Sequence, residues 1–142
     1  MRKTFVPSGK NLERKWHLLD AKGKVLGRFA VEAAGLLMGK SKVDYMPNLD
    51  RGDYVVVVNA REVVVSGGKK GKKVYRRHSQ YPGGLKEESL ASLIARKPER
   101  VIELAVSGML PKNKLRKLRL ARLKVFGAEK HLYEGKVNRN DK

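Results

Sequence analysis

The chain has 142 residues, the length of one ordinary domain, and its 41% hydrophobic content is enough to close a single core. It carries 33 Lys and Arg against 14 Asp and Glu, a formal net charge of +19, and no cysteine, which excludes disulfide bonds and thiolate zinc sites. A surplus of this size repels itself unless a polyanion or a dense counterion cloud screens it, so the composition favours a polyanionic partner.

The amino-terminal stretch begins with basic residues, but Pro7 and Gly9 interrupt any apolar region after them, which argues against a secretory signal. No segment approaches the about 18 apolar residues that a membrane span needs. We therefore expect a cytoplasmic protein with no membrane partner. We also expect one domain over residues 1–142, with an N-terminal extension at residues 1–13 and a C-terminal tail at residues 128–142.

The first half of the chain predicts a strand, a helix and a second strand. The short apolar run at residues 16–21 favours a buried strand. In residues 25–40, apolar side chains recur at intervals of three and four, which predicts a helix with one buried face. Residues 53–60 contain four consecutive valines, a pattern typical of a strand that is covered on both faces and lies parallel to its neighbours. This order predicts an α/β fold.

The second half of the chain predicts mainly helices. We expect a further strand at residues 73–77, and then a helix over residues 87–97, because two glutamates open this segment and basic residues close it. Pro98 suits the first turn of another helix, which Pro111 stops. The basic run that follows predicts a short helix leading into a strand at residues 123–126.

The stretch SGGKKGKK at residues 66–73 follows an apolar run, as a phosphate-binding loop would. Ser66 stands where a Walker loop needs its first glycine, and Lys73 stands where the loop needs a hydroxyl for magnesium. Two interpretations remain: a flexible, solvated turn, or a backbone clamp for RNA. The cations of such a clamp are Lys69, Lys70, Lys72, Lys73, Arg76 and Arg77, and Tyr75, His78 and Tyr81 are interleaved as stacking or 2′-hydroxyl partners.

A second basic run, KNKLRKLRLARLKVF, begins at Lys112 and contains no acidic residue. A solvated helix face normally carries some acids, so this run favours nucleic-acid contact. A membrane-surface helix is the weaker alternative, because the leucines form no clean apolar face. The predicted RNA contacts in this run are Lys112, Lys114, Arg116, Lys117, Arg119 and Arg122.

The sequence offers no constellation for catalysis. Asp44, Asp50 and Asp53 flank a turn, and turn formation or capping explains them better than metal binding does. His17 lies within the first predicted strand and is interpreted as a core histidine with a satisfied side chain. The serines near His78 are neighbours in sequence, which does not define a catalytic geometry. We predict no enzyme activity, metal site, cofactor or small-molecule substrate.

Several motifs in the same order resemble the bacterial large-subunit ribosomal protein family called L-thirteen. The most specific is GMLPKN at residues 108–113, followed by the second basic run. The others are KWHLLDA at 15–21, LGRFA at 26–30, GDYVVVVNA at 52–60, HSQYPGGLK at 78–86 and the longer segment 105–131 that contains GMLPKN. The resemblance covers nearly the whole chain.

This resemblance implies a three-layer α/β/α domain around a small, mainly parallel four-stranded sheet with basic loops and extensions. It also implies a structural component of the large ribosomal subunit that binds large-subunit rRNA, enters early in assembly and lies beside other ribosomal proteins. Both basic runs are then its RNA contacts. The rival interpretations are a small nucleotide-dependent enzyme built on the parallel sheet and a general DNA-compacting protein.

Overall fold

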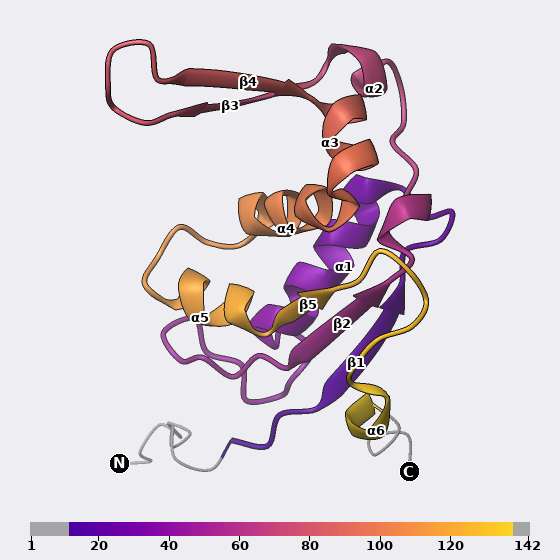
Figure 1. Cartoon of the computed structure of the whole chain (residues 1–142). Helices are drawn as coiled ribbons and strands as arrows, with labels where there is room; N and C mark the ends of the chain where they lie inside the picture. Colours follow the sequence, from indigo (N-terminus) through magenta and orange to yellow (C-terminus); the bar gives the residue numbers. More distant parts are fainter. Residues whose placement is uncertain (1–11, 138–142) are drawn as a thin grey trace, which may run out of the picture.

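The computed structural model describes residues 12–137, and its first three elements confirm the predicted strand, helix and strand (Figure 1). Strand β1 is Trp16–Asp20, helix α1 is Leu26–Met38 and strand β2 is Tyr54–Val58. The two strands are parallel, with Trp16 opposite Tyr54. The chain therefore crosses from one strand to the next through a helix, as the valine run predicted.

The described part of the central sheet has three strands in the order β1-β2-β5, all parallel, where we expected four. Strand β5, Leu123–Val125, lies at the predicted position and pairs with β2. One isolated parallel bridge joins Val25, which follows β1 in the chain, to Val64, which follows β2. The strand predicted at residues 73–77 does form, one residue later, but it belongs to a separate hairpin.

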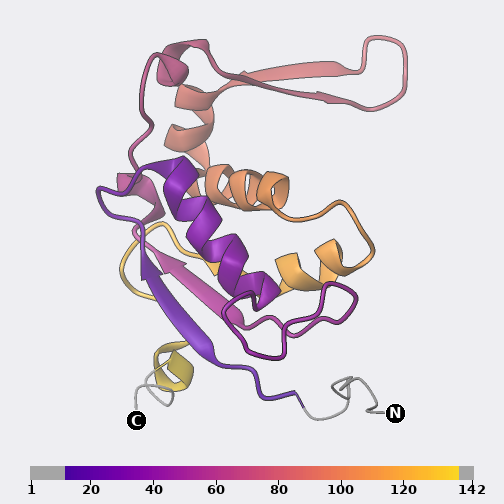
Figure 2. The same cartoon turned by 180° about the vertical axis from the view of Figure 1, so that it is seen from behind.

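Helix α1 and helix α4, Pro98–Met109, pack on the same face of this sheet (Figures 1 and 2). The connections from β1 to β2 and from β2 to β5 run in the same direction across the sheet. Because such connections have the same hand, they place α1 and α4 on one face. Both long helices therefore lie on one face, and the expected three-layer arrangement with helices on both faces is not fully confirmed. On the other face, Tyr133 stacks on Trp16 at 5.1 Å between ring centroids, next to the four-residue helix α6, Glu134–Val137.

The core lies between the sheet and these two helices. Val55 and Val57 on β2 are fully buried, as are Leu37 on α1 and Ile102 on α4. The end of α1 approaches the turn before β2 so closely that a Cβ on Gly52 would lie 1.7 Å from the carbonyl oxygen of Leu37. This contact fixes the turn that carries Asp50 and Asp53 against the helix.

An antiparallel hairpin, here called the arm, projects from the body (Figure 1). It consists of β3, Val74–His78, β4, Leu85–Ser89, and the loop between them. Two expectations are corrected here. Glu87 and Glu88 lie in β4 and not in a helix, and helix α3, Leu90–Arg96, begins after Ser89, whose Oγ accepts a hydrogen bond from the Ser92 N–H.

The remaining short elements connect these parts. The glycine and lysine stretch, expected as a loop, contains one turn of helix, α2, Lys69–Lys72, at the base of the arm. A 3-10 turn, η1, spans Ala60–Glu62, and helix α5, Leu115–Ala121, leads into β5 as predicted. Residues 1–11 of the expected extension and 138–142 of the expected tail lie outside the described residues.

Candidate nucleic-acid interface

The structure gathers the cations of the first basic run on the arm and its base. All seven predicted residues are exposed: Lys69, Lys70, Lys72 and Lys73 at the base, and Arg76, Arg77 and His78 on β3. The Nζ atom of Lys73 lies 5.1 Å from the centre of the Tyr75 ring, a cation–π contact that orients this lysine. Glycine is needed here at Gly67, whose φ of +68° lies in the left-handed region.

The two faces of the arm differ in charge. On one face Arg76 lies opposite Glu87, and its Nε donates a 2.5 Å hydrogen bond to the Glu87 carboxylate. On the other face Arg77 lies directly opposite Lys86. Within the described residues neither of these two cations forms an ion pair, so their charges are uncompensated. The sequence analysis missed Lys86.

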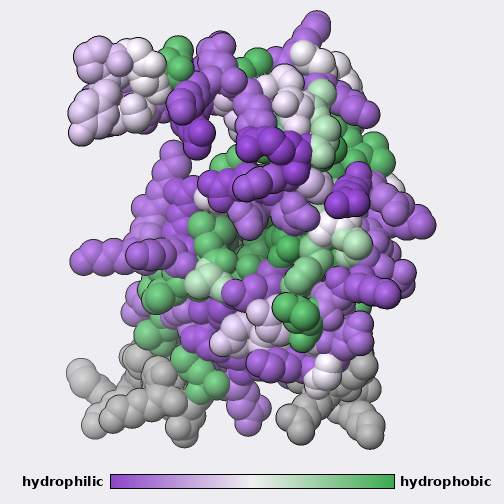
Figure 3. All heavy atoms as spheres, viewed as in Figure 1, coloured by the Kyte–Doolittle hydropathy of each residue, from purple (hydrophilic) through white to green (hydrophobic). Residues whose placement is uncertain are grey.

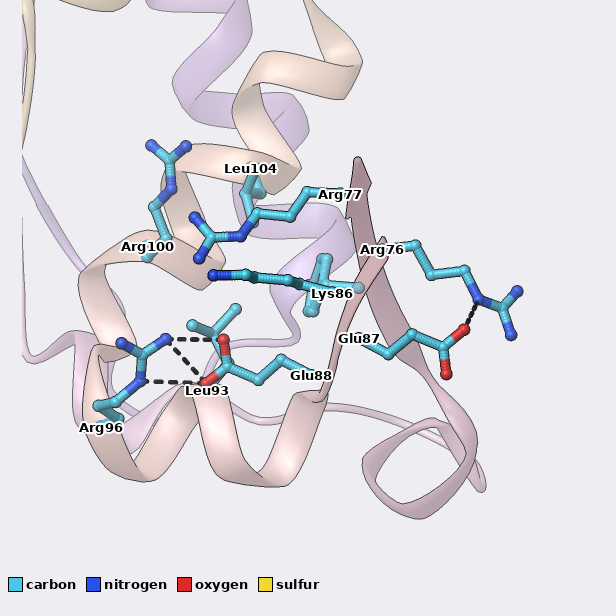
Figure 4. Close-up of a pocket in the computed structure, with 10 residues that line it drawn as sticks. Arg76, Arg77, Lys86, Glu87, Glu88, Leu93, Arg96, Arg100 and Leu104 are labelled. Carbon is cyan, nitrogen blue, oxygen red and sulfur yellow. Dashed lines mark hydrogen bonds and ion pairs between the residues drawn. The ribbon is translucent and has the colours of Figure 1, made fainter. Parts of the chain in front are cut away.

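The face with Arg77 and Lys86 turns toward helices α3 and α4, and an open groove of 510 Å³ lies between them. Figure 3 shows the gap beneath the arm, and Figure 4 shows Arg77 and Lys86 side by side, both pointing toward Arg100 of α4. Leu93 and Leu104 also line the groove. Cations from the arm and from α4 thus line the same groove as these two leucines.

Two carboxylates partly neutralise the helical side of this groove. Glu88 accepts hydrogen bonds from Arg96 at 2.7 to 3.0 Å, and Arg100 donates one to Glu103 at 2.8 Å. Sequence reasoning missed Arg96 and Arg100 as well as Lys86, because the three are spread over separate elements. Lys86 could have been found from the sequence only by recognising the hairpin, whose register places it opposite Arg77.

The second basic run is divided by burial. Lys112, Lys114 and Lys117 are exposed, whereas Arg116 is half-buried and donates a 2.5 Å hydrogen bond to the Ser107 hydroxyl. A further groove of 360 Å³ between α4 and α5 includes Lys117 and shares Arg100 and Leu104 with the groove beneath the arm. One continuous surface along α4 therefore joins the arm to the second basic run.

Arg119 and Arg122, also predicted as RNA contacts, are buried at 1% and 6% exposure. Arg122 binds both carboxylate oxygens of Asp50, at 2.5 and 2.6 Å, and Arg119 Nε lies 3.7 Å from the same carboxylate. Arg14 contributes a third contact at 3.7 Å. These two side chains face an internal carboxylate because α5 packs against the turn before β2.

Burial opposes the charge of Asp50, but the hydrogen bond and charge of Arg122 outweigh it, so the pKa of Asp50 lies below its ordinary value. Asp53 has the same balance. Its burial is outweighed by Lys42, whose Nζ lies 2.6 Å away, by the Lys15 N–H and by His17 at 3.2 Å, so its pKa is also lowered. Both aspartates are structural ion-pair partners.

The residues that were considered for catalysis or metal binding have structural partners. His17 contacts Asp53, so its side chain has the partner that was expected, but at 33% exposure it does not lie in the core. Asp44 forms an ion pair with Arg51. Among residues 12–137, no group of three or more His, Asp or Glu side chains is placed to hold a metal ion. Across the same range, no helix combines the length and apolar character of a membrane span.

A small α/β scaffold that displays cations on a projecting arm, and uses its buried carboxylates for internal ion pairs, belongs to the class of structural nucleic-acid-binding proteins. The sequence profile of the family described as ribosomal protein L13 matches residues 14–132. The chain belongs to this family.

Curated relatives match along nearly their whole length. A Nostoc sp. protein called large ribosomal subunit protein uL13 is 51% identical over 134 residues, which cover 94% of this chain and 89% of the relative. Proteins of the same name from Vibrio cholerae and Clostridioides difficile are 51% and 50% identical, over 91% and 92% of both chains respectively. The resemblance identified from the sequence motifs is therefore confirmed.

Proposed function

We propose that this protein is a structural constituent of the large ribosomal subunit that binds large-subunit rRNA in the cytoplasm and has no catalytic activity. The observation that carries the proposal is the convergence of cations from the arm, α4 and the second basic run on adjoining grooves, in a chain whose relatives are named large ribosomal subunit proteins. A formal charge of +19 fits a permanent polyanionic partner.

The mechanism is neutralisation and positioning of RNA phosphates. Helices α2 and α3 join the arm to the body, so cations on separate elements contact phosphates that are distant in the RNA sequence. The major groove of A-form RNA is too narrow for side chains, so the protein recognises RNA shape and backbone. A protein that joins separate RNA segments in this way acts early in subunit assembly and then lies beside neighbouring ribosomal proteins.

The proposed contacts are the exposed members of the two basic runs and the half-buried Arg116. They are Lys69, Lys70, Lys72, Lys73, Arg76, Arg77 and His78 from the first run, and Lys112, Lys114, Arg116 and Lys117 from the second. Arg119 and Arg122 have a different proposed role: their ion pairs with Asp50 position α5 and thereby the lysines around it.

The experiment compares binding of the full chain to deproteinised large-subunit rRNA and to random duplex DNA over a range of salt concentrations. We expect a clear preference for the rRNA. If about eight phosphates are neutralised, the logarithm of affinity falls by about 0.7 to 0.9 per contact for each tenfold rise in salt. Equal affinity for duplex DNA supports the DNA-compacting alternative, and retention on ATP resin supports the nucleotide-dependent enzyme.

Sedimentation of cell extract on a gradient tests the ribosomal assignment independently of affinity. We expect the protein to travel with the large subunit at low salt and to leave it only at high salt, because surface charge contacts are screened by ions. A protein that stays at the top of the gradient at both salt concentrations contradicts the proposal.

A further inference from the structure

The cross-strand pair of Arg77 and Lys86 opposes the stability of the arm. Like charges directly opposite each other in an antiparallel pair are destabilising. The neighbouring pair on the other face, Arg76 and Glu87, has the opposite charges that stabilise such a hairpin. On one face of the arm the charges are therefore paired, whereas on the other face Arg77 and Lys86 have no carboxylate partner among the described residues.

The position of the unsatisfied face indicates where that anion lies. Arg77 and Lys86 point into the groove beneath the arm, toward Arg100 on α4 (Figure 4). Glu87, the nearest carboxylate along β4, points to the other side and is occupied by Arg76. Glu88 is held by Arg96. The described carboxylates around the groove are thus all engaged, and two cations are left without one.

We propose that the groove between the arm and α4 binds the sugar-phosphate backbone of an RNA strand, with Arg77 and Lys86 on one wall and Arg100 on the other. Phosphate supplies the missing negative charge between the two arm residues. Contacts between these cations and phosphates carry no sequence information, so we expect the groove to hold the strand without reading its bases. The inference rests on the proposed function, since it names the site where that RNA is held.

The test uses Lys86→Glu, which turns the like-charge pair into an opposite-charge pair. Two effects of opposite sign are expected in the full-length protein. The Tm of the free protein rises by about 1–3 °C, because a repulsive cross-strand pair becomes attractive. The affinity for deproteinised large-subunit rRNA at 0.1 M salt falls by about fivefold or more, because at least one phosphate contact is lost. Arg77→Glu is expected to act in the same way.

Lys130→Glu is the matched control, since Lys130 is exposed, lies between β5 and α6 and undergoes the same change of charge. If Lys86→Glu lowers affinity no more than Lys130→Glu does, the inference is overturned. A rise in Tm with unchanged RNA affinity also overturns it, because the charge of Lys86 would then contribute nothing to RNA binding. A wild-type protein that does not prefer rRNA over duplex DNA contradicts the proposed function instead, whatever the variants do.

If Lys86→Glu does not fold, Lys86→Gln removes the repulsion without adding a negative charge. The slope of log affinity against log salt then decreases in magnitude by about one, the value for a single phosphate contact. An unchanged slope in a folded Lys86→Gln protein contradicts the proposed contact.

Discussion

Arg122 and Asp50 are 72 residues apart in sequence and form a two-pronged ion pair, with guanidinium to carboxylate distances of 2.6 and 2.5 Å. The pair joins the residue before β5 to the turn before β2. Both side chains are largely removed from water, at 8% and 13% exposure. The geometry of the basic run around α5 thus depends on a carboxylate from the other half of the chain.

Arg122→Met is expected to lower the free energy of unfolding by about 3–5 kcal/mol, because it leaves the buried Asp50 without its main partner. The measurement is urea denaturation of the RNA-free protein. Glu32→Gln is the control: it breaks the exposed contact between Glu32 and Lys24 and should cost less than about 1 kcal/mol. Equal effects of the two substitutions would show that the internal pair contributes no more than a surface pair.

The stability of the protein is expected to fall in acid. The folded-state pKa values of Asp50 and Asp53 are lowered, so their contribution is fully present above the unfolded pKa of about 3.9. It is lost as the pH falls through the lower, folded values. Urea denaturation between pH 6 and pH 2 measures this slope. Asp50→Asn should reduce stability at neutral pH and make the acid dependence shallower, and an unchanged slope would contradict the assignment.

Gly52→Ala is expected to lower the free energy of unfolding by several kcal/mol, because the new Cβ collides with the backbone oxygen of Leu37 at the end of α1. Gly27→Ala is the matched substitution. Gly27 lies in the first turn of α1 and has open space around it, so alanine should stabilise the helix slightly, by up to about 0.5 kcal/mol. In thermal unfolding, the Tm should fall for Gly52→Ala and rise for Gly27→Ala.

Replacement of Lys112, Lys114 and Lys117 together by glutamine tests the second basic run. All three are exposed, so the free energy of unfolding should change by less than about 0.5 kcal/mol per site. The slope of log affinity for rRNA against log salt should decrease in magnitude by about two to three. An unchanged slope in the folded triple variant would remove this run from the interface.

Much of the central fold could be predicted from local patterns, because its elements are buried. The valine run of β2 and the apolar stripe of α1 are apolar because these residues are buried against other elements. Strand β4 could not be predicted in this way: Leu85–Ser89 is mostly exposed, so it lacks both an apolar run and a clear alternation. Its two glutamates were consequently taken as the start of a helix.

The site was predicted in part for a similar reason. Charge density identifies a basic run, but it does not tell which cations have an internal partner. Arg119 and Lys117 differ by two positions in sequence, and one is buried beside Asp50 while the other is exposed. Only contacts between distant parts of the chain distinguish the two residues. The role of Lys86 likewise depends on Arg77, the residue opposite it in the hairpin.

The aromatic stack on the open face of the sheet gives the molecule a built-in optical probe. Trp16 is the single tryptophan of the chain, and it stacks on Tyr54 at 4.2 Å and on Tyr133 at 5.1 Å. Lys136 Nζ lies 5.2 Å from the same indole. Undocking of the segment around Tyr133 would therefore change the tryptophan fluorescence, so the position of this segment can be followed without any label.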